Sequence, residues 1–304
     1  MGTPVFAVPA LRALVEAGHE IPLVVTQPDR PRGRSKKPVP PPVKELAESL
    51  NLPVFQPEGV KKPEAIEEIR KTGPDAFVVA AFGQILPRAL LDIPRFGSFN
   101  VHASLLPAYR GAAPINRAII NGEERTGITI MLMDEGMDTG AILTSGEEPI
   151  LPDDTAGALT ERLGLMGAGL IVKALAEFEG GRLKPVPQDD TRATYAPILK
   201  KETGRIDWTK TAREIERTVR GLDPWPGAYT FRAGKMMRIW KAATAVAEAG
   251  ALPGAVVSAE KDGIVVAAGE GAVVIHGLQP EGGRRMKASE YLAGHKISPG
   301  ERLG

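Results

Sequence analysis

The first hundred residues alternate between helical and strand-like segments, and no other feature of the sequence limits the possible folds as strongly. Apolar residues recur at helical spacing in three segments and run almost continuously in four short ones. Buried apolar strands joined by helices are typical of a parallel sheet covered on both faces. The sequence therefore predicts an N-terminal α/β domain with a Rossmann-like parallel sheet. We expect its helices at 8–17, 42–50 and 63–71, and its strands at 21–26, 54–56, 76–80 and 97–101.

The sequence changes character near Gly204. From there, one amphipathic helix is followed by short strand-like segments separated by glycine turns, which is typical of a small OB-like β-barrel. The preceding segment, 184–200, has no clear period and contains three prolines. We therefore expect an α/β domain at 1–183, a linker at 184–203 and an OB-like barrel domain at 204–304. The barrel strands are predicted at 228–231, 236–240, 254–258, 263–267 and 272–278.

The composition excludes several classes of protein. The chain has 304 residues and no cysteine, which leaves no disulfide framework, thiol nucleophile or zinc–thiolate site. No apolar run is long enough to span a bilayer, and the N-terminus has no charged-then-apolar signal region. We expect a cytoplasmic protein that does not enter a membrane.

A cationic loop follows the first predicted strand. Five bases fall within eight residues, and the proline and glycine between them exclude a helix or a strand. A solvated surface loop is one interpretation, but Lys and Arg grouped in this way also attract a phosphate backbone. From Gly204 onward, 15 Lys and Arg outnumber 11 Asp and Glu, a weak indication of a polyanionic partner. The bases of the loop are Arg30, Arg32, Arg34, Lys36 and Lys37.

Two polar residues lie at the end of the strand predicted at 97–101. Asn100 and His102 are two residues apart, so their side chains leave the same face of the strand. A loop follows, and a helix is predicted to begin at Pro114. Polar side chains at strand ends form the functional site in many open α/β sheets. The alternative is a polar pair that only satisfies local backbone groups.

Two further loops also follow predicted strands. Residues 81–87, which read Ala-Phe-Gly-Gln-Ile-Leu-Pro, either line a pocket for a flat ligand or fill the gap between sheet and helix. Residues 134–140 carry three acids between strands predicted at 127–133 and 141–149. A hairpin turn is the simpler interpretation of that loop, because Asp, Gly and Thr are ordinary turn residues.

The sequence lacks the usual fingerprints of a dinucleotide, a nucleoside triphosphate, a serine hydrolase elbow or a zinc protease. The remaining candidate catalytic residues are Asn100 and His102, together with an acid from a neighbouring strand end. These groups suit acyl transfer to an amine. An amide and a protonated imidazole donate to the developing oxyanion, and a carboxylate takes a proton from the amine directly or through a water. Asp138 is the best candidate for that carboxylate.

At these positions the sequence resembles a known family. Residues 100–107 (NVHASLLP) and 109–115 (YRGAAPI) resemble the signature of folate-dependent formyltransferases, and residues 134–140 (DEGMDTG) resemble their second motif. Within the family, residues 2–4, 26–31, 33–34, 36–37, 205–208 and 224–226 resemble the members that act on initiator methionyl-tRNA.

The resemblance implies that the formyl group of 10-formyltetrahydrofolate passes to the amino group of methionine on initiator methionyl-tRNA, without a metal and in a monomer. Asn100, His102 and Asp138 are implied to be catalytic. The cationic loop is implied to enter the acceptor stem, and the barrel to hold the tRNA. The folate site is expected to include Ser104, Leu105, Leu106 and Pro107, together with Phe82, Gln84, Ile85 and Leu86 of the second loop.

One departure from the family concerns the centre of the sheet. Family members carry a short apolar strand before the Gly-Thr-Pro turn, whereas this sequence starts at Met1. We expect a truncated start or an incomplete sequence rather than a different fold, and a missing central strand would leave its two neighbours without a partner.

Two alternatives remain at this point. A formyltransferase for a small amine, such as glycinamide ribonucleotide or an amino sugar, would use the same catalytic set but needs neither the cationic loop nor a basic barrel. A non-catalytic RNA-binding protein would leave the two motifs without a purpose.

Overall fold

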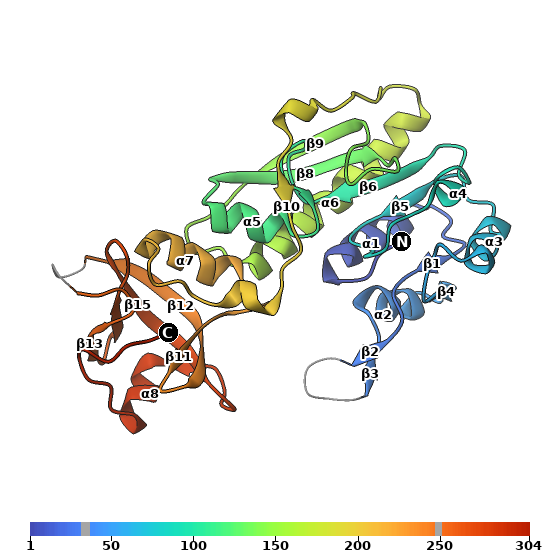
Figure 1. The fold of residues 1–304 in the computed structure, drawn as a ribbon. Coiled ribbons are helices and arrows are strands. Elements are labelled where there is room, and N and C mark those ends of the chain that lie inside the picture. Colours follow the sequence, from blue (N-terminus) through green and yellow to red (C-terminus); the bar gives the residue numbers. More distant parts are fainter. Residues whose placement is uncertain (32–36, 247–250) are drawn as a thin grey trace. The chain divides into compact units, whose positions relative to one another are not determined.

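The computed structural model describes residues 1–31, 37–246 and 251–304 (Figure 1). The chain divides into two compact units, each formed by segments that are distant in the sequence. The first unit comprises residues 1–114, 125–149 and 160–197, and the second comprises residues 115–124, 150–159 and 198–304.

A four-stranded sheet is the centre of the first unit, with the strand order β5-β6-β8-β9. β5 and β6 are parallel, whereas β8 is antiparallel to both β6 and β9, so the acidic loop is a hairpin connection. The predicted α/β class is confirmed. The strands are β5 (Phe77–Val79), β6 (Ser98–His102), β8 (Arg125–Leu132) and β9 (Ile142–Pro149). A separate parallel pair is formed by β1 (Val24–Val25) and β4 (Val54–Phe55).

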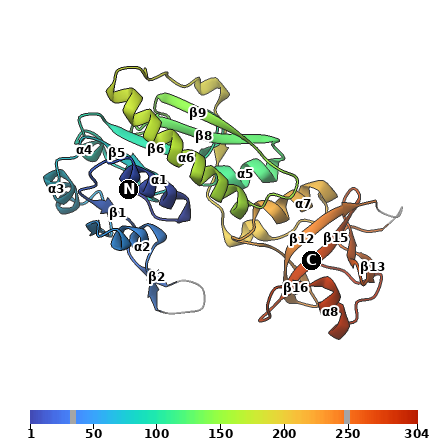
Figure 2. The same ribbon diagram turned by 180° about the vertical axis from the view of Figure 1, so that it is seen from behind.

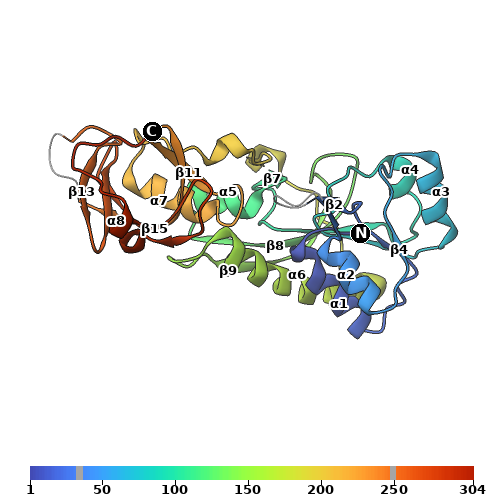
Figure 3. The same ribbon diagram turned by 90° about the horizontal axis from the view of Figure 1, so that it is seen from below.

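The four helices predicted at 8–17, 42–50, 63–71 and from Pro114 begin where the sequence predicts. Pro42, Pro63 and Pro114 each occupy the first helical position, where a missing N–H costs nothing. α1 and the long α6 lie on one face of the sheet, and β7 lies on the other (Figures 2 and 3). The helices are α1 (Val8–Glu16), α2 (Pro42–Ser49), α3 (Pro63–Lys71), α4 (Arg88–Leu91), α5 (Pro114–Asn121) and α6 (Ala156–Glu179).

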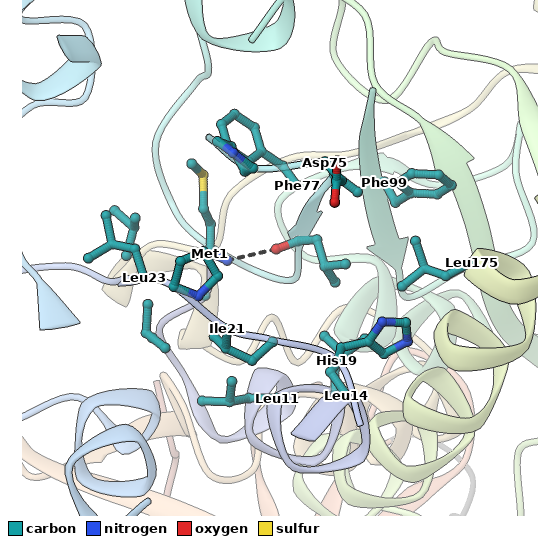
Figure 4. A pocket seen from close by; sticks show the side chains of 18 of the residues that line it. Met1, Leu11, Leu14, His19, Ile21, Leu23, Asp75, Phe77, Phe99 and Leu175 are labelled. Atoms are coloured by element: carbon teal, nitrogen blue, oxygen red, sulfur yellow. Dashed lines mark hydrogen bonds between the residues drawn. The ribbon is translucent and has the colours of Figure 1, made fainter. Parts of the chain in front are cut away.

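The expected gap at the centre of the sheet is present. Residues 1–2 form the only backbone link between β1 and β5 among the described residues: the Gly2 amide donates to Val25 and the Ala80 amide donates to Met1. Behind them lies a cavity of about 410 Å³ between the two strand edges, α1 and α6 (Figure 4). The Met1 amino group donates to the Val78 carbonyl at 2.7 Å, and burial lowers its pKa to about 5. None of the predicted site residues lines this cavity.

Strand β6 packs closely against α6. The ring of Phe99 meets Phe178 edge to face at 5.3 Å, and Gly167 faces Val101. Because strand side chains alternate, Asn100 and His102 point away from α6. The helix thus fixes the strand from behind and leaves the opposite face for the polar pair.

A matched pair of helix glycines tests this packing. A Cβ on Gly167 would lie 2.7 Å from Cγ1 of Val101, whereas a Cβ on Gly169 would have no neighbour within 4 Å. We expect Gly167→Ala to destabilise the protein by about 1–3 kcal/mol. We expect Gly169→Ala to stabilise it by about 0.5–1 kcal/mol, because alanine suits an exposed helix interior better than glycine. Urea unfolding of both variants measures the difference, and equal effects would contradict it.

The second unit is a curled antiparallel sheet with the order β11-β12-β15-β14-β13, and β16 pairs with β15. The C-terminal residues bridge its two edges: the Gly304 amide donates to Phe231, and the Leu303 amide donates to Gly254. The C-terminal residues therefore link the first and last strands of the sheet, which is compatible with an OB-like domain. Its elements are α7 (Ala212–Gly221), β11 (Ala228–Arg232), β12 (Lys235–Ala245), β13 (Val256–Glu260), β14 (Gly263–Ala267), β15 (Ala272–Pro280), β16 (Met286–Lys287) and α8 (Ala288–Gly294).

The remaining strands are short and pair in two places in the first unit. β2 (Arg30–Pro31) and β3 (Pro38–Val39) form the antiparallel stem of the cationic loop. β7 (Arg110–Gly111) pairs in parallel with β10 (Tyr195–Ala196), so part of the segment predicted as a linker packs on the first unit. Within the described ranges, no helix is long and apolar enough to cross a membrane.

Candidate functional site

The three predicted catalytic residues converge in the structure. The Asn100 Nδ2 donates to Asp138 Oδ1 at 3.2 Å, and the His102 Nδ1 lies 3.5 Å from Asp138 Oδ2. The same Oδ2 accepts the backbone amide of Gly111 at 2.8 Å. Both oxygens of the carboxylate are therefore engaged, and the His102 side chain is only 5% exposed.

Strand pairing fixes two of these side chains. Asn100 is paired with Val79 on one side and Met131 on the other, and His102 is paired with Thr129. A strand held on both sides presents its side chains at set positions. Asn100 and His102 are therefore placed by the sheet itself.

Asp138 is placed by the turn between β8 and β9. Its backbone has φ of 55°, the left-handed conformation that aspartate tolerates better than most residues. Gly140 follows two residues later, where a Cβ would lie 1.8 Å from the Leu132 carbonyl oxygen. The turn can approach β8 only with glycine at this position, and this approach brings the carboxylate to the end of β6.

The second ring nitrogen of His102 is also engaged. Its Nε2 lies 3.0 Å from the backbone carbonyl of Tyr109. Because a carbonyl only accepts hydrogen bonds, Nε2 carries a proton and donates it there. Tyr109 has φ of 61°, so the loop after β6 turns sharply at this residue and directs its carbonyl toward the ring. The ring is thus oriented with Nδ1 toward Asp138.

Arg110 and Gln188, two residues for which the sequence predicts no role, support this arrangement. The Gln188 Nε2 donates to the carbonyls of Asp138 at 2.8 Å and Gly140 at 2.7 Å. Its Oε1 accepts from the Arg110 Nε at 3.1 Å and from a terminal nitrogen of the same guanidinium at 2.8 Å. We name this pair the Arg110–Gln188 brace. Arg110 lies within the first family motif, but no sequence signal marks Gln188.

The predicted folate residues fall into two groups. Ser104 and Leu106 are buried, and they hold the loop after β6: the Ser104 Oγ donates to the Ala108 carbonyl at 2.6 Å, and the Leu106 amide donates to Thr129 Oγ1 at 3.1 Å. Phe82 and Leu86 are buried in the core of the first unit. Leu105, Pro107, Gln84 and Ile85 keep exposed surface, and Ile85 is 66% exposed.

The stem of the cationic loop is anchored to the first unit. The Asp29 carboxylate accepts from the Gln56 Nε2 at 2.7 Å and from the Lys44 Nζ at 2.8 Å. These hydrogen bonds, first that of Gln56 and then that of Lys44, lower the pKa of Asp29 below its usual value. Arg30 forms an exposed ion pair with Glu58 at 3.6 Å, and Lys37 is exposed. The predicted residues Arg32, Arg34 and Lys36 lie outside the described residues.

The described part of the chain holds no group of three or more His, Asp or Glu residues arranged to bind a metal ion. The described site thus offers an amide, an imidazole, a carboxylate and a backbone N–H. This set can donate to a developing oxyanion and accept a proton from a nucleophile.

Residues 1–175 match the formyl transferase family, and residues 198–296 match the family described as formyl transferase, C-terminal domain. The chain therefore belongs to the formyl transferase family. Among its relatives are the methionyl-tRNA formyltransferase of Citrifermentans bemidjiense, 52% identical over all of this chain and 95% of the relative, and that of Geobacter sulfurreducens, 51% identical with the same coverage.

Solved structures with a similar fold come from more distant proteins. An N-formyltransferase from Helicobacter canadensis, in complex with folinic acid and dTDP-3-aminofucose, has a TM-score of 0.65 and 20% identity over 90% of this chain and 96% of that chain. HypX from Aquifex aeolicus, in complex with tetrahydrofolic acid, has a TM-score of 0.60 and 22% identity over 84% of this chain and 45% of that chain. At these identities the likeness concerns the fold alone.

Proposed function

We propose that this chain transfers the formyl group of 10-formyltetrahydrofolate to the amino group of methionine on initiator methionyl-tRNA. The observation that carries the proposal is the convergence of Asn100, His102 and Asp138 in a chain whose relatives of the same function match it from end to end. The reaction forms a C–N bond to the methionine amine and breaks the C–N bond to the folate.

In the proposed mechanism, attack by the amine turns the formyl oxygen into an oxyanion. One N–H of the Asn100 amide already donates to Asp138, and its second N–H is available to that oxygen. His102 would provide a second donor once its Nε2 proton passes from the Tyr109 carbonyl to the formyl oxygen, because its Nδ1 faces Asp138. The attacking nitrogen gains positive charge and loses a proton, which Asp138 accepts directly or through a water. A proton returns to the folate nitrogen as it leaves.

Different segments of the chain would bind the two substrates. We propose that the loops carrying Ser104, Leu105, Leu106 and Pro107 and carrying Phe82, Gln84, Ile85 and Leu86 form the folate site. The buried members would shape its walls, and exposed Ile85 would contact the ligand. The cationic loop would bind the tRNA backbone through Arg30, Arg32, Arg34, Lys36 and Lys37, because each neutralised phosphate releases counterions.

We propose a separate role for each part of the chain. Residues 1–183 would form the catalytic domain, 184–203 the connection and 204–304 the tRNA-binding domain. We propose that the protein acts as a monomer in the cytoplasm, where its two substrates occur.

A substrate comparison tests the function. The purified chain is expected to formylate charged initiator methionyl-tRNA from 10-formyltetrahydrofolate, with kcat/KM far above that for glycinamide ribonucleotide or an amino sugar. Formylation of either small amine at a higher kcat/KM would contradict the proposal. Binding of the tRNA without any formyl transfer would favour a non-catalytic RNA-binding protein.

A further inference from the structure

We propose that the Arg110–Gln188 brace positions the Asp138 carboxylate for proton transfer, an inference that rests on the proposed function of this site. The Gln188 amide uses all four of its hydrogen-bonding positions, two to carbonyls of the acidic loop and two to Arg110. A side chain with every donor and acceptor satisfied holds its partners in one arrangement.

The first effect of the brace is on the peptide that follows Asp138. Gln188 fixes the carbonyls of Asp138 and Gly140, which lie on either side of Thr139. With both carbonyls held, the backbone at Asp138 is kept in its left-handed conformation, with φ of 55°. The direction of its side chain depends on this conformation.

The second effect is on the other side of the carboxylate. Arg110 directly precedes Gly111, whose amide donates to Asp138 Oδ2 at 2.8 Å. The Arg110 side chain is only 2% exposed, so its guanidinium needs the acceptors that Gln188 and Asp190 provide. Gln188 therefore connects residues 110–111, whose Gly111 amide donates to Asp138, with the loop at 134–140 that contains Asp138.

The brace is itself anchored. Two residues before Gln188, Val186 exchanges two backbone hydrogen bonds of 2.8 Å with Ile142 at the start of β9. After it, β10 pairs with β7 beside Arg110. Gln188 is half-buried between exposed neighbours, so its side chain points inward from a surface segment.

The substitution Gln188→Met tests the proposal, because it keeps the length of the side chain and removes its hydrogen bonds. We expect kcat for formyl transfer to fall by up to about 100-fold, since a small displacement of a reacting group has effects of that size. We expect KM for the folate and for the tRNA to change less than twofold. Lys184→Met, at an exposed position of the same segment, is the control and should keep the parent kcat.

A double-mutant cycle separates positioning from general stabilisation. If Gln188 acts through Asp138, adding Gln188→Met to Asp138→Asn causes little further loss of the residual rate. A kcat of Gln188→Met within twofold of the parent, or a loss that adds fully to that of Asp138→Asn, would overturn the proposal.

A readout without turnover keeps the test independent of the proposed function. In Gln188→Met, the Gly111 amide is expected to exchange its hydrogen faster than in the parent, while the amides of β8 keep their rates. Unchanged protection of Gly111 would overturn the inference. An inactive parent in which Gly111 still responds would contradict the proposed function and leave the brace supported.

Discussion

Replacing Asp138 by asparagine is expected to lower kcat for formyl transfer by about 10² to 10⁴-fold, the usual contribution of a positioned acid or base. The carboxylate accepts on both oxygens, from Asn100 on one side and from Gly111 on the other. An asparagine must therefore turn its NH₂ toward a donor in either orientation. The variant loses both the proton acceptor and the geometry, while folate and tRNA binding should persist. Steady-state kinetics with charged tRNA measures the effect.

The matched control is Asp134→Asn in the same loop. Within the described ranges, the hydrogen bonds of Asp134 use its Oδ1, which accepts from the Gly136 amide at 3.0 Å and the Thr139 hydroxyl at 2.6 Å. The carbonyl oxygen of an asparagine can keep both bonds, so this variant should retain most of the parent kcat. Equal losses of kcat in the two variants would show that any Asp→Asn change in this loop lowers activity, and that Asp138 has no special catalytic role.

The sequence predicted those parts of the site that depend on local pattern. The two-residue spacing of Asn100 and His102 predicted a shared strand face, and pairing of β6 on both sides places them there. Pro114 predicted the start of α5 because proline fits the first helical turn. Asp138 could be inferred only from its loop between two predicted strands and from the family motif, since no local pattern relates it to a strand 38 residues earlier.

Other parts of the site leave no such signal. The Gly111 amide is a backbone group, so its role is invisible in the residue type. Gln188 reaches Arg110 across 78 residues through two-residue strands, which are too short to show a period. The direction of β8, antiparallel to β6, also depends on tertiary packing, because the sequence of an apolar strand has the same pattern in parallel and antiparallel sheets. The two edges of the sheet in the second unit are linked by residues 301–304, which carry no strand pattern.

Removing charge from the cationic loop is expected to change tRNA use without changing folate use. In a variant with Arg34, Lys36 and Lys37 replaced by glutamine, KM for the tRNA should rise. The slope of log K against log salt should become shallower by about 0.9 for each phosphate of a duplex stem that the variant no longer neutralises. Titration of binding between low and physiological salt measures this slope, and KM for 10-formyltetrahydrofolate should stay at the parent value.

A variant of equal net charge distinguishes a specific loop from a general attraction. Lys61, Arg70 and Lys71 are exposed cations at α3 and just before it, and replacing them by glutamine removes the same three charges. If the loop contacts the tRNA, this control keeps both the KM and the salt slope of the parent, because exposed charges beyond a Debye length of about 8 Å are largely screened at physiological salt. Equal changes in both variants would assign the effect to the net charge of the protein. A loss of folate binding in the loop variant would place the loop in the folate site instead.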